Sequence, residues 1–170
     1  MRPRRAARGA PMAEPYDPYH PTDEHRALRE TVAKWAEQHL DPQADGHDAT
    51  ETFNVELFRK MARELGIFGV TIPEDAGGLG LDATAAVIIH EELSRFDPAY
   101  TLSYLAHEVL FVNNLYYSGN ADQRARYLPR TINTSWIAGM GMSEPGAGTD
   151  VLGMSATARR DGDHYVLNGT

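Results

Sequence analysis

The stretch MSEPGAGTD, residues 142–150, is the most informative part of this chain of 170 residues. Its proline and glycines let the backbone turn tightly and expose consecutive N–H groups, which can form an anion-binding nest for a pyrophosphate. Ser143 and Thr149 add a hydroxyl at each rim. An ordinary turn between two strands uses the same residue types, and the residues alone favour that interpretation. The stretch is not a Walker loop, because no Gly-Lys-Ser/Thr follows, and it lacks the third glycine of a dinucleotide fingerprint.

The residues before this stretch have the periodicity of helices. Apolar side chains recur at helical spacing, and residues that cap helices precede each run. Residues 41–53 are expected to be a polar loop, and the helix that starts at Pro98 is expected to be buried, because it is apolar on most sides. The five predicted helices are Thr22–Leu40, Asn54–Leu65 with Gly66 as its terminating glycine, Asp82–Asp97, Pro98–Tyr117 and Asn120–Pro129.

The periodicity changes near residue 135. Trp136–Ser143 is predicted to be a buried strand, and Ser155–Arg160 and His164–Leu167 are predicted to form a hairpin. Asp161-Gly162 is the expected turn, because type I′ turns require positive φ. The sequence therefore predicts an α+β chain, with a helical domain over 22–135 and an incomplete β-domain over 136–170, since three strands with open edges do not make a domain.

Composition and charge exclude several classes of protein. The chain is 42% hydrophobic and 24% charged, has no cysteine and carries a net charge of −8. These values exclude wholesale disorder, disulfides and Cys-ligated zinc, and no apolar run is long enough for a membrane span. An acidic body argues against nucleic-acid binding. Residues 1–21 are expected to be a flexible leader; its arginines fit a short transit peptide, although translation from Met12 is the favoured explanation.

Other clusters of polar residues have structural explanations. No histidine pair has the spacing of a zinc helix, so no metal site is expected. Glu91 and Glu92 diverge by about 100° on a helix and are expected to form a salt-bridging face. The glycine-rich loop PEDAGGLGLD (73–82) is interpreted as a turn that ends in the Asp82 cap rather than as a phosphate site.

Several separated motifs together resemble the acyl-CoA dehydrogenase family. They are PEDAGGLGLD (73–82), EELSR (91–95), GNADQRARYLP (119–129), GMGMSEPGAGTDV (139–151) and ATARRDGDHYVLNGT (156–170). They occur in the family's order and cover residues 22–170, and LSYLAHEVLFVNNLYYSGN (102–120) is most similar to the isovaleryl-CoA and other short- and branched-chain members. The resemblance implies an N-terminal helical domain followed by the start of a β-barrel-like middle domain. The family's C-terminal four-helix domain is absent from these 170 residues.

The resemblance also implies a cofactor site. FAD would lie against Met140, Gly141 and Met142, and Ser143 would donate to the pyrimidine edge of the flavin. Gly148 and Thr149 would meet the pyrophosphate, with Thr149 also close to an acyl-CoA substrate. The family's general-base glutamate is expected beyond residue 170, so no catalytic residue is assigned, and Glu91, Glu92 and Glu144 are not expected to replace it.

The implied activity is FAD-dependent α,β-dehydrogenation of short or branched acyl-CoA thioesters to trans-2-enoyl-CoA, in fatty-acid or branched-chain amino-acid degradation. Electron-transfer flavoprotein would be the acceptor, the full-length protein a homotetramer, and its location the bacterial cytoplasm or, less favoured, the mitochondrial matrix. The 170 residues alone are expected to be inactive. Acyl-CoA oxidase, flavin-dependent monooxygenase and a non-catalytic helical assembly module remain alternatives. Five side chains would either line the acyl pocket or, as is favoured, pack inside the bundle: Thr101, Leu102, Tyr104, Leu105 and His107.

Overall fold

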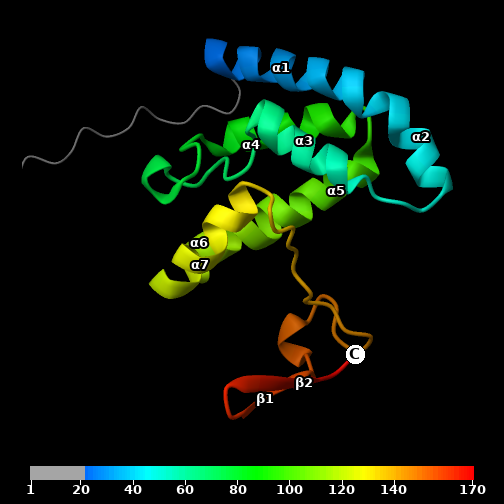
Figure 1. The fold of residues 1–170 in the computed structure, drawn as a ribbon. Coiled ribbons are helices and arrows are strands. Elements are labelled where there is room, and N and C mark those ends of the chain that lie inside the picture. The colour runs from blue at the N-terminus through cyan, green and yellow to red at the C-terminus, as the bar shows by residue number, and fades with distance from the viewer. Residues whose placement is uncertain (1–21) are drawn as a thin grey trace, which may run out of the picture.

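The structure is a computed structural model that describes residues 22–170. The expected leader, 1–21, lies outside the described residues. The helices stack in layers, with α1 packed along α4 and the hairpin at the far end (Figure 1). The elements are α1 (Asp23–His39), α2 (Asp41–Ala49), α3 (Val55–Leu65), η1 (Glu74–Ala76), α4 (Ala83–Ser94), α5 (Pro98–Leu105), η2 (Ala106–Asn113), α6 (Asn114–Ser118), α7 (Ala121–Ile132), η3 (Val151–Gly153), β1 (Thr157–Asp161) and β2 (His164–Asn168).

The predicted helix starts are confirmed by their caps. Thr22, Asn54, Asp82 and Asn120 each accept a hydrogen bond from the backbone N–H three residues further on. Each cap satisfies one of the free donors at a helix N-terminus. Gly66 ends α3 with a φ of 63°, in the left-handed region that glycine adopts without steric cost.

The structure contains more helix than predicted at two places. Residues 41–49, expected to be a loop, form α2, whose proline lies in the first turn where no N–H is needed. The last predicted helix, expected to end at Pro129, continues as α7 to Ile132, and its residues Leu128 and Thr131 are buried. Burial of the residues on both sides of the proline outweighs the hydrogen bond that the proline cannot make.

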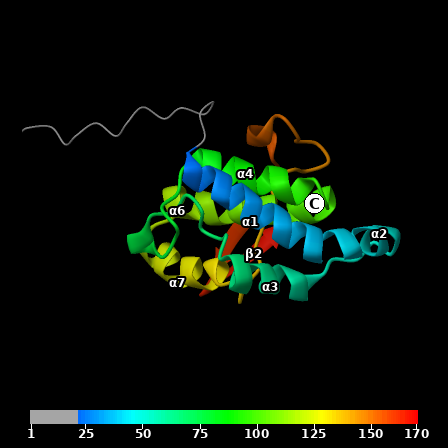
Figure 2. The ribbon, with the colours of Figure 1, turned by 90° about the horizontal axis from the view of Figure 1, so that it is seen from above.

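The fourth predicted helix is present as one continuous element, Pro98–Ser118, made of α5, the π-helical segment η2 and α6. The π segment buries His107, Glu108 and Val112. The expectation that this element is enclosed on most sides is wrong for the described residues, since the side chain of Leu102 is 65% exposed. Seen from above, α1 crosses the bundle with α3 and α4 on either side of it (Figure 2).

The main core lies between α1, α3, α4 and α5. Phe58, Phe68 and Tyr104 are among its largest buried side chains, and the Tyr104 hydroxyl donates to the Ile67 carbonyl at 2.5 Å. A second, smaller cluster around Ile72, Val112 and Leu128 joins η2 to α7. These two clusters hold η2 and α7 in place, and the segment that follows α7 is hydrogen-bonded to both elements.

The C-terminal part contains less sheet than predicted. Trp136–Ser143 has no regular secondary structure and pairs with no strand among the described residues, and none of its residues is buried, so the predicted buried strand is absent. A lone segment has no partner for its backbone groups, which explains why it does not form a strand here. The helical domain followed by a short sheet confirms the α+β fold class, and none of the described helices is long and apolar enough to span a membrane.

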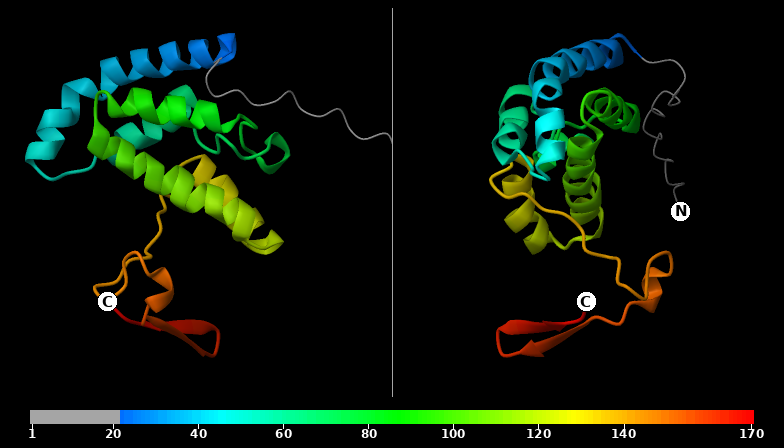
Figure 3. Two further views of the ribbon diagram at one scale, coloured as in Figure 1. Left: turned by 180° about the vertical axis from the view of Figure 1, so that it is seen from behind. Right: turned by 90° about the vertical axis from the view of Figure 1, so that its right-hand side faces the viewer.

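β1 and β2 form the predicted antiparallel hairpin, which lies away from the helices (Figures 1 and 3). Asp161 pairs with His164, so the turn consists of Gly162 and Asp163 rather than the predicted Asp161-Gly162. Only the glycine of these two residues has a positive φ, 63°, whereas a type I′ turn requires positive φ at both.

Candidate functional site

The segment that leads into the candidate site is held by α7 and η2. The Trp136 N–H donates to the Arg130 carbonyl at 2.9 Å, and the Arg130 guanidinium lies 4.7 Å from the centre of the Trp136 ring. Two residues further on, the Ala138 N–H donates to Nδ1 of His107 at 3.0 Å. These contacts hold the chain against α7 and η2 before it reaches Met140.

Met140 and Gly141 line a groove of about 530 Å³ together with Gly139. The opposite walls come from η2, α6 and α7, with Phe111, Asn114 and Tyr127 among the lining residues. The structure therefore places the first two predicted cofactor residues against the helical domain. Met142 is not part of this groove, and its side chain is 44% exposed.

The glycines beside the groove leave its floor open. A Cβ atom at Gly139 or Gly141 would meet no atom within 4 Å, and neither glycine has a positive φ. The fold of the described residues therefore does not require glycine at these positions. Open backbone of this kind suits the close approach of a flat ring, such as the isoalloxazine of FAD.

The loop that follows is closed by its own backbone. The N–H of Glu144 donates to the Ala147 carbonyl at 2.9 Å, and the N–H of Ala147 donates back at 3.1 Å. In this isolated antiparallel bridge, Ser143 and Gly148 are the next residues outward along the two arms. Ser143 and the Gly148-Thr149 pair thus lie on the two arms of one tight turn.

The candidate residues keep donors free. Within residues 22–170, no protein group accepts a hydrogen bond from the backbone N–H of Ser143, Gly148 or Thr149, or from the Ser143 hydroxyl. Unpaired N–H groups and a hydroxyl gathered at a tight turn are the donors that a pyrophosphate or a carbonyl edge requires. The residues present therefore fit FAD both at the open groove and at the loop.

Glu144 has a structural task that sequence reasoning missed. Its carboxylate accepts hydrogen bonds from the N–H of Ser155 at 2.8 Å and of Ala156 at 2.8 Å, and from the Ser155 hydroxyl at 2.9 Å. The Ser155 N–H, followed by the other two donors, lowers the pKa of Glu144. The charged carboxylate ties the loop to the two residues that precede β1. The position of Glu144 inside the loop motif is the one sequence feature that points to this role.

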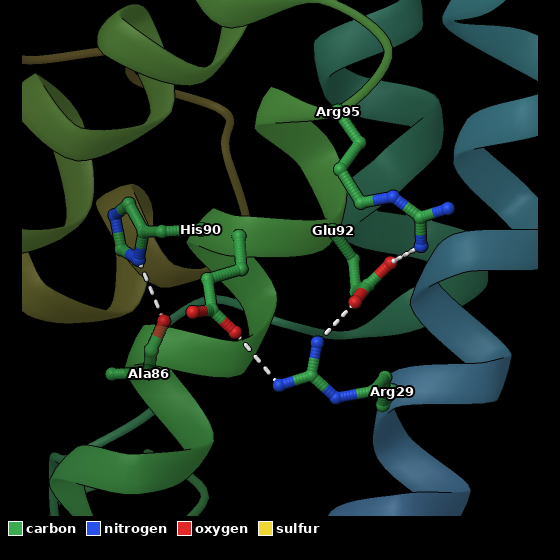
Figure 4. Close-up of polar contacts among 6 residues, drawn as sticks. Arg29, Ala86, His90, Glu92 and Arg95 are labelled. Carbon is green, nitrogen blue, oxygen red and sulfur yellow. Dashed lines mark hydrogen bonds and ion pairs between the residues drawn. The ribbon is translucent and has the colours of Figure 1, made fainter.

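The loop 73–82 and the Glu91-Glu92 pair have structural roles, as predicted. In the loop 73–82, a Cβ at Gly78 would lie 2.2 Å from the Ile72 carbonyl oxygen, so glycine is needed for close backbone packing. Glu91 and Glu92 do form a salt-bridging face, and both bind the same guanidinium, that of Arg29 (Figure 4). No group of side chains among the described residues is suited to hold a metal ion.

Bundle packing accounts for most of the residues considered for an acyl pocket. Thr101, Tyr104 and His107 are buried inside the bundle, while Leu102 points outward. Leu105 lines a cavity of about 630 Å³ between α4 and η2. The buried Glu108 also lines this cavity, but its two carboxylate oxygens accept the N–H groups of the Gly69-Val70 pair at 2.9 and 2.7 Å.

The comparisons with known proteins identify the class of protein to which the helical domain and its adjoining loop belong. The family model described as "Acyl-CoA dehydrogenase, N-terminal domain" matches residues 22–135. The chain belongs to the acyl-CoA dehydrogenase family.

Individual relatives show which part of the family protein is present. The chain is 44% identical over 148 residues to mitochondrial isovaleryl-CoA dehydrogenase of Bos taurus, covering 86% of this chain and 35% of that protein. The solved glutaryl-coenzyme A dehydrogenase in complex with glutaryl-CoA superposes with a TM-score of 0.80 at 33% identity, over 89% of this chain and 39% of that one. An acyl-CoA dehydrogenase of Bacillus anthracis complexed with FAD gives 0.81 at 31% identity, over 91% and 26%. The chain thus spans little more than a third of the curated relative.

Proposed function

We propose that residues 22–170 form the N-terminal part of an FAD-dependent acyl-CoA dehydrogenase that acts on short or branched acyl-CoA thioesters. The observation that carries the proposal is the open groove at Gly139–Gly141 next to a loop with unpaired donors. The similarity to isovaleryl-CoA dehydrogenase supports the choice of acyl chain.

When bound, FAD would supply the hydride acceptor for dehydrogenation of the acyl chain at its β-carbon. Met140 and Met142 pack beside the ring, and the glycine backbone between them admits it closely. Ser143 donates to the pyrimidine edge, where negative charge accumulates on reduction, and a donor placed there stabilises that charge. Gly148 and Thr149 bind the pyrophosphate through N–H groups, and Thr149 also contacts the acyl-CoA.

The general base that removes the α-proton of the acyl-CoA is not assigned to any of the four glutamates considered above. Among the described residues, Glu91 and Glu92 are engaged with Arg29, Glu108 accepts two backbone N–H groups, and Glu144 fastens its loop. None of these carboxylates is free to act as the general base, and the resemblance to the acyl-CoA dehydrogenases implies a general-base glutamate outside the 170 residues. The remaining parts of the proposal are electron-transfer flavoprotein as acceptor, a homotetramer, and a cytoplasmic or mitochondrial-matrix location.

The test uses the complete protein that contains these residues. Purified protein should show bound-flavin absorbance, and isovaleryl-CoA or butyryl-CoA should bleach it, with electrons passing to electron-transfer flavoprotein or ferrocenium. A long-chain acyl-CoA such as palmitoyl-CoA serves as the control and should react more slowly. Peroxide formed stoichiometrically from oxygen would instead indicate an oxidase, and substrate-dependent NAD(P)H consumption a monooxygenase. Folded protein without flavin would contradict the proposal.

A further inference from the structure

His107 is a buried histidine that the proposed chemistry does not use. It lies on η2 with no exposed surface, and the rings of Phe58 and Phe68 stand edge-on to it at centre distances of 5.5 and 5.4 Å. Such an apolar setting disfavours the charged imidazolium, and burial lowers the pKa of His107. A buried polar ring is retained at low cost only when its nitrogens are hydrogen-bonded.

Both ring nitrogens of His107 have partners, and the partners fix the tautomer. Nε2 lies 3.0 Å from the carbonyl oxygen of Thr131, which can only accept, so Nε2 carries the hydrogen. Nδ1 lies 3.0 Å from the N–H of Ala138, which can only donate, so Nδ1 is the acceptor. The neutral ring is thus a bridge between the end of α7 and the segment that follows it.

This bridge reaches the segment where, among the described residues, no other hydrogen bond holds it. Among the described residues, the bond from the Ala138 N–H to His107 is the only hydrogen bond formed by residues 137–143. The preceding anchor is at Trp136 and the following one at Glu144. Met140 and Gly141, which line the groove, come directly after the bridged position.

We propose that His107 is a positioning residue for the flavin-binding stretch: its Nδ1 acceptor sets the course of residues 138–141 along the groove. The proposal rests on the proposed function for its flavin arm, whereas its geometric arm concerns the chain alone. The ring is hydrogen-bonded to the backbone of the stretch and would not itself contact the cofactor. Loss of the acceptor frees the stretch, while loss of the Thr131 contact affects only the end of α7.

Two substitutions separate the nitrogens. In His107→Asn, the side-chain oxygen takes the place of Nδ1 and keeps an acceptor for Ala138. In His107→Gln, the amide nitrogen takes the place of Nε2 and keeps a donor for Thr131. Both variants lose the same ring contacts with Phe58 and Phe68, so a difference between them reports on the Ala138 bond. Tyr104→Phe is the control, because it removes a buried hydrogen bond in the same core that does not involve residues 137–143.

The geometric arm measures amide hydrogen exchange of residues 137–141 in the 170-residue chain. We expect the Ala138 amide to be protected in the wild type, His107→Asn and Tyr104→Phe, and to exchange at least tenfold faster in His107→Gln. The flavin arm measures the FAD dissociation constant of the complete protein, with about tenfold weaker binding expected only in His107→Gln.

The outcomes distinguish the two proposals. If wild-type protein binds no FAD, the proposed function fails, while the exchange arm still decides the role of His107. If wild type binds FAD and His107→Gln matches it in both exchange and affinity, the positioning role is wrong and the proposed function stands. Equal losses in His107→Asn and His107→Gln would also overturn the proposal, because they would show a general packing effect.

Discussion

Arg29 on α1 and Glu92 on α4 form an ion pair in which the carboxylate is 1% exposed and the guanidinium side chain is 44% exposed (Figure 4). The second oxygen of Glu92 accepts from Arg95 at 2.5 Å. A buried carboxylate between two arginines is stable only while both oxygens are satisfied, because an unpaired buried charge is costly. This contact joins α1 and α4, which pack against each other in the main core.

Arg29→Met should therefore destabilise the helical domain by about 1–2 kcal/mol, since it leaves Glu92 with one partner while keeping the apolar stem. Urea unfolding with an unchanged m-value measures the effect. Arg26→Met is the matched control on the same helix. Its pair with Asp23 is exposed, with side-chain exposures of 61% and 98%, so it should change stability by less than about 0.5 kcal/mol. Equal effects of the two substitutions would contradict the assigned role of Glu92.

The lowered pKa of His107 predicts a pH-dependent stability. Burial keeps this pKa below its ordinary value of 6.5 in the folded protein. Below that pH the unfolded chain binds more protons than the folded chain, so the stability contributed by the neutral ring decreases as the pH falls. The loss should reach at most about 1.4 kcal/mol per pH unit.

The comparison with His107→Asn isolates this effect, because asparagine does not titrate. The difference in unfolding free energy between wild type and variant should shrink as the pH is lowered from 7 through 6. Glu108 has the opposite sign, since burial raises its pKa above 4.5, but it is present in both proteins. A difference that stays constant with pH would show that His107 does not titrate in this way.

The local signals of the fold could be predicted from the sequence, whereas the long-range contacts could not. Thr22, Asn54, Asp82 and Asn120 act on a backbone N–H three residues away, so their role is visible in any short window. The α2 helix was not predicted because Asp41-Pro42 and Gly46 are residue types of loops. In the structure the helix begins directly after Leu40, which is buried in the core.

The site shows the same division. The loop 142–150 and its neighbours Met140 and Gly141 were found from motifs that are continuous in sequence. The bond between Ala138 and His107 joins positions 31 residues apart, and that between Glu144 and Ser155 joins positions 11 apart. No periodicity or motif encodes such pairings, because they depend on how the helices bring distant segments together. The cofactor-binding roles of the six assigned residues stay predictions.

Glu144→Gln should loosen the loop without unfolding the helical domain. The amide has one acceptor oxygen and no charge, so it cannot hold the Ser155 and Ala156 N–H groups as the carboxylate does. Exchange of these two amides should rise severalfold, while the unfolding midpoint of the helices stays the same. In wild type the same loosening should appear as the pH falls, because the lowered pKa of Glu144 means that its hydrogen bonds are lost when the carboxylate is protonated.

Asp163→Asn is the control for charge alone. Asp163 is an exposed carboxylate in the hairpin turn, close to the same strands. Its substitution should leave the exchange of Ser155 and Ala156 unchanged. Unchanged exchange in Glu144→Gln as well would show that the loop is held by the Glu144–Ala147 bridge rather than by the carboxylate.

Ser143→Ala should alter the flavin without changing the fold. In the complete protein, loss of one donor at the flavin's pyrimidine edge should destabilise the reduced form by about 1–3 kcal/mol relative to the oxidised form. The flavin reduction potential should therefore become more negative, as potentiometric titration would measure. Ser135→Ala, on the helical side of the segment, is a control that should leave the potential unchanged. The same potential in wild type and Ser143→Ala would refute the role given to Ser143.

Two glycine substitutions should separate folding from cofactor binding. A Cβ at Gly78 would lie 2.2 Å from the Ile72 carbonyl oxygen and 2.6 Å from the Gly69 carbonyl oxygen, so Gly78→Ala forces backbone to move and should cost about 3 kcal/mol. At Gly141 the added methyl group meets no atom within 4 Å, so Gly141→Ala should change stability by less than about 0.5 kcal/mol. If the flavin ring lies against this backbone, the same methyl group occupies its place, and FAD affinity of the complete protein should fall about tenfold. Unfolding curves and FAD titrations of both variants measure the two effects, and unaltered FAD affinity in Gly141→Ala would move the flavin away from the groove.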